Sequence, residues 1–228
     1  MKIPFLSSLL DIVFPRLCVC CGGSLMEGED NICLTCLYTL PRLRETNYSD
    51  NKIMDIFLGR IKLEKAFSWC YFEKQTSVQN ILHHIKYKDK DNLARKIGEI
   101  MAGDMPEFFN GIDAIVPVPL HSKKQKMRGY NQSEEIAKGV QKVVGLPIFS
   151  KLLTRVRFNE TQTHKNKQQR WENTQGIFSL EPNEGFEGKH ILLIDDVITT
   201  GSTAIACLKE LQKIPNVRLS FLSLAVGS

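Results

Sequence analysis

The feature that most constrains the fold is the segment 191–203, which reads ILLIDDVITTGST. Its apolar start is typical of a strand that is buried on both faces, as in a parallel sheet covered by helices. Ligands of such sheets bind beyond the carboxyl ends of the strands. Asp195 and Asp196 follow the apolar run directly, so we expect both carboxylates at the mouth of a binding site.

The turn that follows these acids is rich in hydroxyl groups and contains a glycine. Gly201 lets the backbone approach a ligand closely, and the helix predicted after it presents unpaired N–H groups at its N-terminus. This combination predicts a site for a phosphate monoester. The residues expected to form it are Val197, Thr199, Thr200, Gly201, Ser202 and Thr203.

Two other interpretations of the segment are weaker. A capped strand-to-helix turn without a ligand needs only a lone Thr-Gly-Ser, whereas this chain adds two acids and further hydroxyls. Acids after an apolar strand also occur in P-loop NTPases, but the G-x-x-x-x-G-K-[ST] loop that those enzymes require is absent from the sequence.

Hydrophobic periodicity along the chain predicts alternating strands and helices. The strands are expected at 66–72, 114–118, 191–194 and 217–226. The helices are expected at 3–14, 78–87, 93–105, 131–144 and 202–213, with Asn131 or Ser133 capping the fourth. This alternation predicts an α/β fold with a mainly parallel sheet and helices on both faces.

The length of 228 residues suits one main domain with a small appendage. The polar stretch 42–52 is the predicted linker, which divides the chain into an N-terminal unit, 1–48, and a main domain, 49–228. No apolar run is long enough to span a membrane. Residues 3–14 imitate a signal peptide, but Asp11 interrupts them and no small-residue cleavage site follows, so we expect a cytoplasmic protein.

Four of the seven cysteines form two Cys-x-x-Cys pairs, Cys18 with Cys21 and Cys33 with Cys36. This spacing predicts a small finger that holds zinc, and the zinc is expected to be structural because four protein ligands leave no open position. An iron–sulfur cluster or, in a secreted chain, disulfides are the alternatives. Cys20 is a spare thiol between two ligands.

Positive charge is concentrated in the middle of the chain. Residues 121–170 contain twelve lysines or arginines against three glutamates, although the net charge of the whole chain is only +5. We expect this section to face an anion, with an ordinary solvated surface as the alternative. Within it, the polar composition of residues 154–173 predicts a mobile lid, with an ordinary surface loop as the alternative. The cations of this segment are Arg155, Arg157, Lys165, Lys167 and Arg170.

The segment 191–203 resembles the motif with which type I phosphoribosyltransferases bind PRPP. The chain as a whole resembles the ComF (ComF/ComFC-like) competence-protein family. The features that carry the resemblance follow in the family's order: a four-cysteine finger at 18–36, VPVPL at 116–120, RGYNQ at 128–132 and the PRPP motif at 191–203.

The resemblance implies a type I phosphoribosyltransferase-like fold and a role for each part of the site. Asp195 and Asp196 would bind the ribose hydroxyls, and Thr199 to Thr203 would hold the 5-phosphate. Pyrophosphate would lie at a loop formed by Pro117, Val118 and Pro119, with magnesium offsetting its charge. Lys123, Lys124, Lys126 and Arg128 would neutralise it, although lysines replace arginines that are common in the family, which gives looser contacts.

Two functions are consistent with these features. The first is an enzyme that transfers phosphoribosyl from PRPP to an undefined acceptor, in DNA uptake and competence or in nucleotide metabolism. The second is a non-catalytic PRPP-binding protein that handles single-stranded DNA in natural transformation, with a competence helicase or DNA-processing protein as partner. For the second, aromatic residues near the cations are sparse, namely Tyr130 and Trp171.

Overall fold

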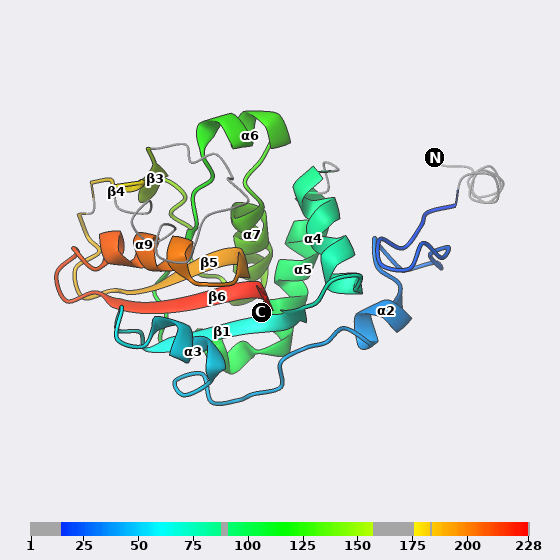
Figure 1. Cartoon of the computed structure of the whole chain (residues 1–228), viewed down its shortest axis with the longest axis horizontal. Coiled ribbons are helices and arrows are strands. Elements are labelled where there is room, and N and C mark those ends of the chain that lie inside the picture. The colour runs from blue at the N-terminus through cyan, green and yellow to red at the C-terminus, as the bar shows by residue number, and fades with distance from the viewer. Residues whose placement is uncertain (1–14, 88–90, 157–175, 183, 228) are drawn as a thin grey trace.

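A computed structural model describes residues 15–87, 91–156, 176–182 and 184–227. Its centre is a sheet of four parallel strands in the order β1-β6-β5-β2 (Figure 1). These strands are β1 (Lys65–Phe72), β2 (Ala114–Pro117), β5 (His190–Ile198) and β6 (Arg218–Gly227). All four expected strands are therefore confirmed, and β5 extends beyond its apolar start to include both acids.

Helices cover both faces of this sheet, as the alternating pattern predicted (Figure 1). One face carries α4 (Ser77–Tyr87), α5 (Asp91–Asp104) and α7 (Gln132–Val144). The other carries α3 (Lys52–Phe57) and α9 (Ser202–Leu211), and the ring of Phe57 packs 5.2 Å from that of Phe221 in β6. The core is mostly apolar, because each strand places buried side chains toward both layers.

Helices α5 and α7 cross in direct backbone contact. A Cβ atom added to Gly98 would lie 2.1 Å from the carbonyl oxygen of Ile136, and one added to Gly139 would lie 1.9 Å from that of Arg95. Glycine is therefore required on both helices at this crossing. The contact fixes α7 against the core, and the N-terminal turn of α7 reaches the acids of β5.

Several short elements were not expected from the sequence. They are α2 (Leu34–Tyr38), α3, the 3₁₀ helix η1 (Pro106–Phe109), α6 (Ser122–Arg128) and the antiparallel hairpin of β3 (Leu153–Arg155) and β4 (Phe178–Leu180). Helix α6 reads SKKQKMR and buries no residue, so hydrophobic periodicity could not reveal it. The helix expected at 3–14 and residues 157–173 of the expected lid lie outside the described residues.

The N-terminal unit packs against the edge of β1 and against α4. The N–H of Leu43 donates to Trp69 O at 2.9 Å, so part of the expected linker lies along the sheet. Asn80 of α4 donates from Nδ2 to the carbonyl oxygen of Cys20 at 2.9 Å. The boundary near residue 48 stays a prediction. Among the described helices, none is both long and apolar enough to cross a membrane.

Candidate functional site

Two adjacent carboxylates lie in the second half of β5, and both side chains are buried. Asp195 is 8% exposed and Asp196 is 6% exposed. Asp195 Oδ1 accepts hydrogen bonds from Ser133 Oγ at 3.0 Å and from the N–H of Asp196 at 2.9 Å. Asp196 Oδ1 accepts from the N–H of Val197 at 2.9 Å. Strand and helix together therefore hold both acids in defined orientations.

Lys86, in the last turn of α4, approaches only one of these acids in an ion pair. Its Nζ lies 2.7 Å from Asp196 Oδ2. Burial raises the pKa of Asp195 to about 8, and the neighbouring charge of Asp196 adds to this effect. Burial opposes ionisation of Asp196 too, but the ion pair with Lys86, together with hydrogen bonds from Asp195 and the N–H of Val197, holds the pKa of that carboxyl below its usual value. At neutral pH we therefore expect Asp196 to be ionised and Asp195 to keep its proton.

The hydroxyl-rich turn closes a small pocket between β5 and α9. The pocket has a volume of about 60 Å³. Its lining residues are Asp195, Val197, Ile198, Thr199, Thr200, Gly201, Ser202, Thr203 and Ala204. All the turn residues predicted from the sequence are thus brought together around one pocket at the N-terminus of α9. Arg60, which the sequence did not single out, donates from Nη1 to the carbonyl oxygen of Thr200 at 3.3 Å.

Gly201 caps α9 with a φ of +72°, a conformation that favours glycine. A Cβ atom at this position would lie 2.6 Å from Ile56 Cγ2 of α3. The close approach that requires glycine is therefore to α3, whereas the sequence argument placed it toward a ligand. The side-chain space at Gly201 is taken by the packing of two helices on the same face of the sheet.

The proline-containing loop continues β2 and is buried. Val118 N donates to Ile194 O of β5 at 2.9 Å, and Asn131 donates from Nδ2 to the carbonyl oxygen of Val118 at 3.0 Å. Pro117, Val118 and Pro119 are all buried. Their side chains support the loop from within, and the chain then enters α6.

Four basic side chains from three elements lie close enough to interact, and two of them, Lys86 and Arg155, also interact with the acids. We name Lys86, Lys124, Arg128 and Arg155 the cation group. Burial lowers the pKa of Lys124, and the charges of Arg155, Arg128 and Lys86 lower it further. Burial likewise lowers the pKa of Arg155, and electrostatic interactions with Cys207 and Asp195 partly oppose this effect. The group is therefore a concentration of positive charge that a bound anion would relieve.

The arginines of the cation group are held by aromatic rings. Arg128 lies 5.3 Å from the ring centroid of Tyr87, and Arg155 lies 5.5 Å from that of Phe178. Each also has a buried Nε atom without a hydrogen-bond partner in the described part of the chain. Lys123 and Lys126 are exposed on α6. Arg157, Lys165, Lys167, Arg170 and Trp171 lie outside the described residues.

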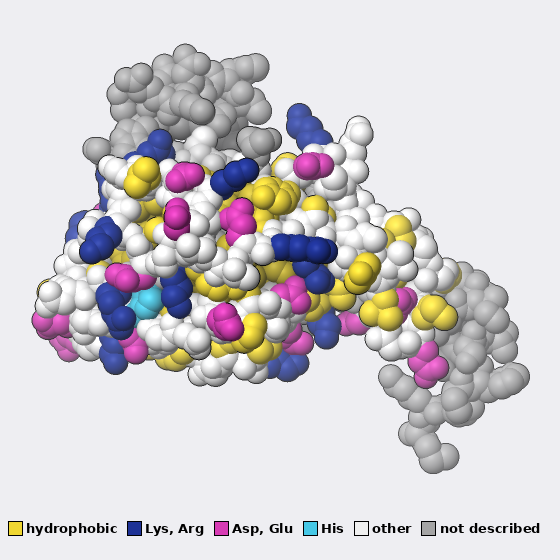
Figure 2. Space-filling model, turned by 90° about the horizontal axis from the view of Figure 1, so that it is seen from below, with side chains coloured by type: hydrophobic (Ala, Val, Ile, Leu, Met, Phe, Trp, Pro, Cys, Tyr) yellow, Lys and Arg dark blue, Asp and Glu magenta, His cyan; other side chains and the backbone are white. Residues whose placement is uncertain are grey.

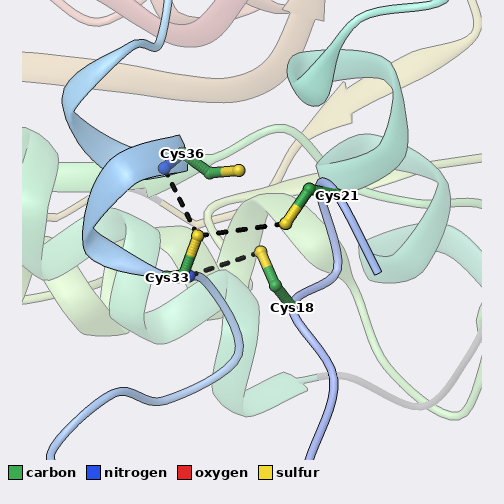
Figure 3. A group of neighbouring side chains, drawn as sticks. All are labelled: Cys18, Cys21, Cys33 and Cys36. Atoms are coloured by element: carbon green, nitrogen blue, oxygen red, sulfur yellow. Dashed lines mark hydrogen bonds between the residues drawn. The ribbon is translucent and has the colours of Figure 1, made fainter. Parts of the chain in front are cut away.

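The four paired cysteines form a separate cluster in the N-terminal unit (Figure 3). Their Sγ atoms all lie within 4.8 Å of one another, and those of Cys21 and Cys33 are 4.0 Å apart. Tetrahedral Zn–S bonds of about 2.3 Å place sulfurs about 3.8 Å apart, so the cluster fits a metal ion held by thiolates. Backbone donors, foremost the N–H of Cys33, outweigh burial and lower the pKa of Cys18 to about 6.

Cys20 is not one of the four cysteines whose Sγ atoms cluster. Its Sγ lies 3.9 Å from the carbonyl oxygen of Ser77 in α4, and burial raises its pKa to about 12. Cys70 and Cys207 are fully buried, as their apolar surroundings predicted. All seven cysteines are free thiols in the structure.

Comparison with known proteins supports the resemblance found in the sequence. DNA utilization protein YhgH of Salmonella typhi is 32% identical over 128 residues, which are 54% of this chain and 56% of that protein. Competence protein F of Haemophilus influenzae is 35% identical over 103 residues, 45% of each chain. The chain therefore has homologues named for DNA utilisation and for competence. It spans about half the length of the curated relatives it matches.

Structural comparison finds type I phosphoribosyltransferases. A crystal structure of adenine phosphoribosyltransferase matches with a TM-score of 0.42 and 15% sequence identity, covering 65% of this chain and 74% of that one. No protein-family model matches the chain.

Proposed function

We propose that the site at the end of β5 binds PRPP and that the protein transfers its phosphoribosyl group to an acceptor, with release of pyrophosphate. The observation that carries this proposal is the meeting of three kinds of groups around β5. A hydroxyl-lined pocket at a helix N-terminus, two buried acids and the cation group match the three polar parts of PRPP.

Each part of the ligand has its own set of residues in this proposal. The 5-phosphate lies in the pocket of Thr199 to Thr203, where hydroxyls and the first N–H groups of α9 donate to it. Asp195 and Asp196 bind the ribose hydroxyls. Lys124, Arg128 and Arg155 neutralise the pyrophosphate, beside the rigid loop of Pro117, Val118 and Pro119.

The reaction requires that charge be held in place while a bond changes. The acceptor forms a bond to C1 of the ribose as the bond from C1 to the pyrophosphate oxygen breaks, and the electron pair leaves with pyrophosphate. Positive charge develops on the ribosyl ring, so fixed groups around the ring and the leaving group stabilise the transition state. Magnesium that enters with PRPP supplies further neutralisation of the leaving group. The protein provides no covalent nucleophile in this scheme.

The cysteine cluster has a structural role in the proposal. Cys18, Cys21, Cys33 and Cys36 bind one zinc ion, which organises an N-terminal unit comprising residues 1–48, while residues 49–228 form the phosphoribosyltransferase-like domain. A thiolate metal site and three further cysteines outside any disulfide suit a reducing compartment, so we place the protein in the cytoplasm.

A second candidate function is binding of single-stranded DNA during DNA uptake, without turnover of PRPP. The names of the relatives favour this setting, and a competence helicase or DNA-processing protein would then be a partner. On the face seen from below, Figure 2 shows basic side chains interspersed with acidic ones, so the described part of this face presents no continuous basic track for a single strand. Tyr130, the one described aromatic candidate of the two, already uses its hydroxyl to donate to Ile85 O.

Calorimetry with PRPP and magnesium, followed by assays of pyrophosphate release with panels of acceptors, tests the proposal. We expect binding of PRPP, and release of pyrophosphate with at least one base, amine or nucleic-acid acceptor. Binding without release in every panel would favour the second function. Absence of PRPP binding would refute the site assignment.

A further inference from the structure

Lys86 forms an ion pair with Asp196 and none with the adjacent Asp195. We propose that Lys86 is a positioning residue of the site, which holds Asp196 as an ionised acceptor for a ribose hydroxyl while Asp195 carries a proton. The two neighbouring carboxylates then have different roles. This inference rests on the proposed ribose 5-phosphate site and adds to it a residue from a different helix.

The contacts of the two acids are unequal. Asp196 Oδ2 lies 2.7 Å from Lys86 Nζ and 3.5 Å from Gln132 Nε2, whereas Asp195 receives hydrogen bonds from a neutral hydroxyl and a backbone N–H. Two adjacent buried carboxylates repel each other when both are ionised, so a cation in direct contact with one of them favours the charge on that acid. The ion pair assigns the charge to Asp196.

The backbone around Lys86 is anchored on both sides. The hydroxyl of Tyr130 donates to the carbonyl oxygen of Ile85, and the guanidinium of Arg128 lies over the ring of Tyr87. Both contacts come from the end of α6 and the turn after it. The last turn of α4 is therefore fixed before any ligand arrives, and Lys86 is directed toward β5 rather than left as a free surface lysine.

Other charged or titratable groups act mainly on the other members of the site. Lys124 of α6 interacts with Lys86, and Arg155 of β3 interacts with Asp195. Cys207 of α9 is fully buried, and burial raises the pKa of its thiol, so it stays neutral. Among these groups Lys86 has the ion pair with Asp196, so its removal is expected to change the charge state of that acid.

An ionised Asp196 and a protonated Asp195 suit a pair of neighbouring hydroxyls. A carboxylate accepts a charge-assisted hydrogen bond from one hydroxyl, and a protonated carboxyl can donate to the oxygen of the other. Without Lys86, the pKa of Asp196 should rise. The single proton of the pair would then be shared between Asp195 and Asp196 instead of lying on Asp195. Binding of the ribose would then weaken, and it would weaken most at acidic pH.

The test is calorimetry with ribose 5-phosphate from pH 5.5 to pH 8.5 on wild type, Lys86→Met and Lys86→Arg. Ribose 5-phosphate is the probe because it lacks pyrophosphate, so loss of a direct contact from Lys86 to pyrophosphate cannot lower its affinity. We expect Lys86→Met to lower affinity about tenfold or more near pH 6. In Lys86→Met, the pH below which binding is lost should be higher than in wild type. Lys86→Arg should restore the affinity and the pH profile in part.

Lys189→Met is the matched control, because it removes the same charge from an exposed residue immediately before β5, at the opposite end of the strand. It should leave affinity and pH profile unchanged. Melting temperatures establish that each variant is folded. If Lys86→Met does not fold, Lys86→Gln replaces it, since glutamine removes the charge and keeps a donor.

A double-mutant cycle with Asp196→Asn distinguishes positioning from direct contact. In the Asp196→Asn background, Lys86→Met should change affinity by less than about twofold, because its partner acid is already gone. Fully additive losses, or wild-type affinity and pH profile in Lys86→Met or its substitute Lys86→Gln, would overturn the inference. Failure of the wild-type protein to bind ribose 5-phosphate would instead refute the proposed function.

Discussion

Removal of the charge of Lys124 should separate PRPP from ribose 5-phosphate, and Lys124→Met is the variant that tests this. Lys124 is partly buried among three other cations, and burial and their charges both lower its pKa. In the free protein, the surroundings of Lys124 therefore disfavour its positive charge. A charge-assisted contact from Lys124 to pyrophosphate contributes about 1.5 to 3 kcal/mol, which is about 10- to 150-fold in Kd.

The same substitution should not destabilise the free protein. Methionine keeps most of the length of lysine and removes its repulsion from the three other cations. The free energy of unfolding, measured by thermal denaturation, should therefore stay within about 1 kcal/mol of the wild-type value or increase. Loss of PRPP affinity together with unchanged or improved stability is the pattern expected of a residue retained for binding.

Calorimetry with both ligands decides between this explanation and a general electrostatic field. PRPP should lose affinity by the amount above, whereas ribose 5-phosphate should change by less than about 1 kcal/mol. The control Lys189→Met should change neither. Equal losses for both ligands would refute the division of labour. If single-stranded DNA binding then fell with the same substitution and declined steeply with salt, the DNA-binding function would be favoured.

The remaining predictions concern the cysteine cluster, the pocket and the helix crossing. Elemental analysis should find one zinc per chain, lost in Cys18→Ser and retained in Cys20→Ser; full zinc content in the first variant would contradict the ligand set. Thr200→Val and Asp196→Asn should each weaken the binding of PRPP and of ribose 5-phosphate, measured by calorimetry, without unfolding the protein. Unchanged affinities would refute the site. Gly139→Ala should lower the free energy of unfolding by about 1 to 3 kcal/mol in urea titrations, because its Cβ atom meets backbone of α5, and wild-type stability would show that the helices separate easily.

A substitution at Gly201 would disturb helix packing as well as a bound ligand. A valine at this position would block a ligand that approached Gly201 closely, but its Cβ atom would also meet Ile56 of α3 and the backbone would be strained. Loss of binding in such a variant would therefore report on packing between α3 and α9 as well as on the ligand. Thr200→Val is the cleaner probe, because it keeps the shape of the side chain and removes one hydroxyl.

Local sequence determined the main strands, the long helices, the pocket turn and the cysteine pairs. Each of these leaves a local signal in the sequence, such as an apolar run, an apolar period or a fixed spacing. Asn131 caps α7 through the N–H two residues later, and the hydroxyls of Thr200 and Ser202 lie 2.9 Å apart within one turn. Periodicity and spacing report such interactions directly, which is why these elements could be predicted.

Only the tertiary structure decided which distant groups meet at the acids. Lys86 reaches Asp196 because α4 and β5 pack in the same fold, and no spacing in the sequence links the two residues. Arg60 contacts Thr200 for the same reason, and α6 escaped detection because a helix that buries no side chain has no apolar period. Periodicity records which face of an element is buried, whereas the partner across a sheet or between helices depends on how the whole chain packs.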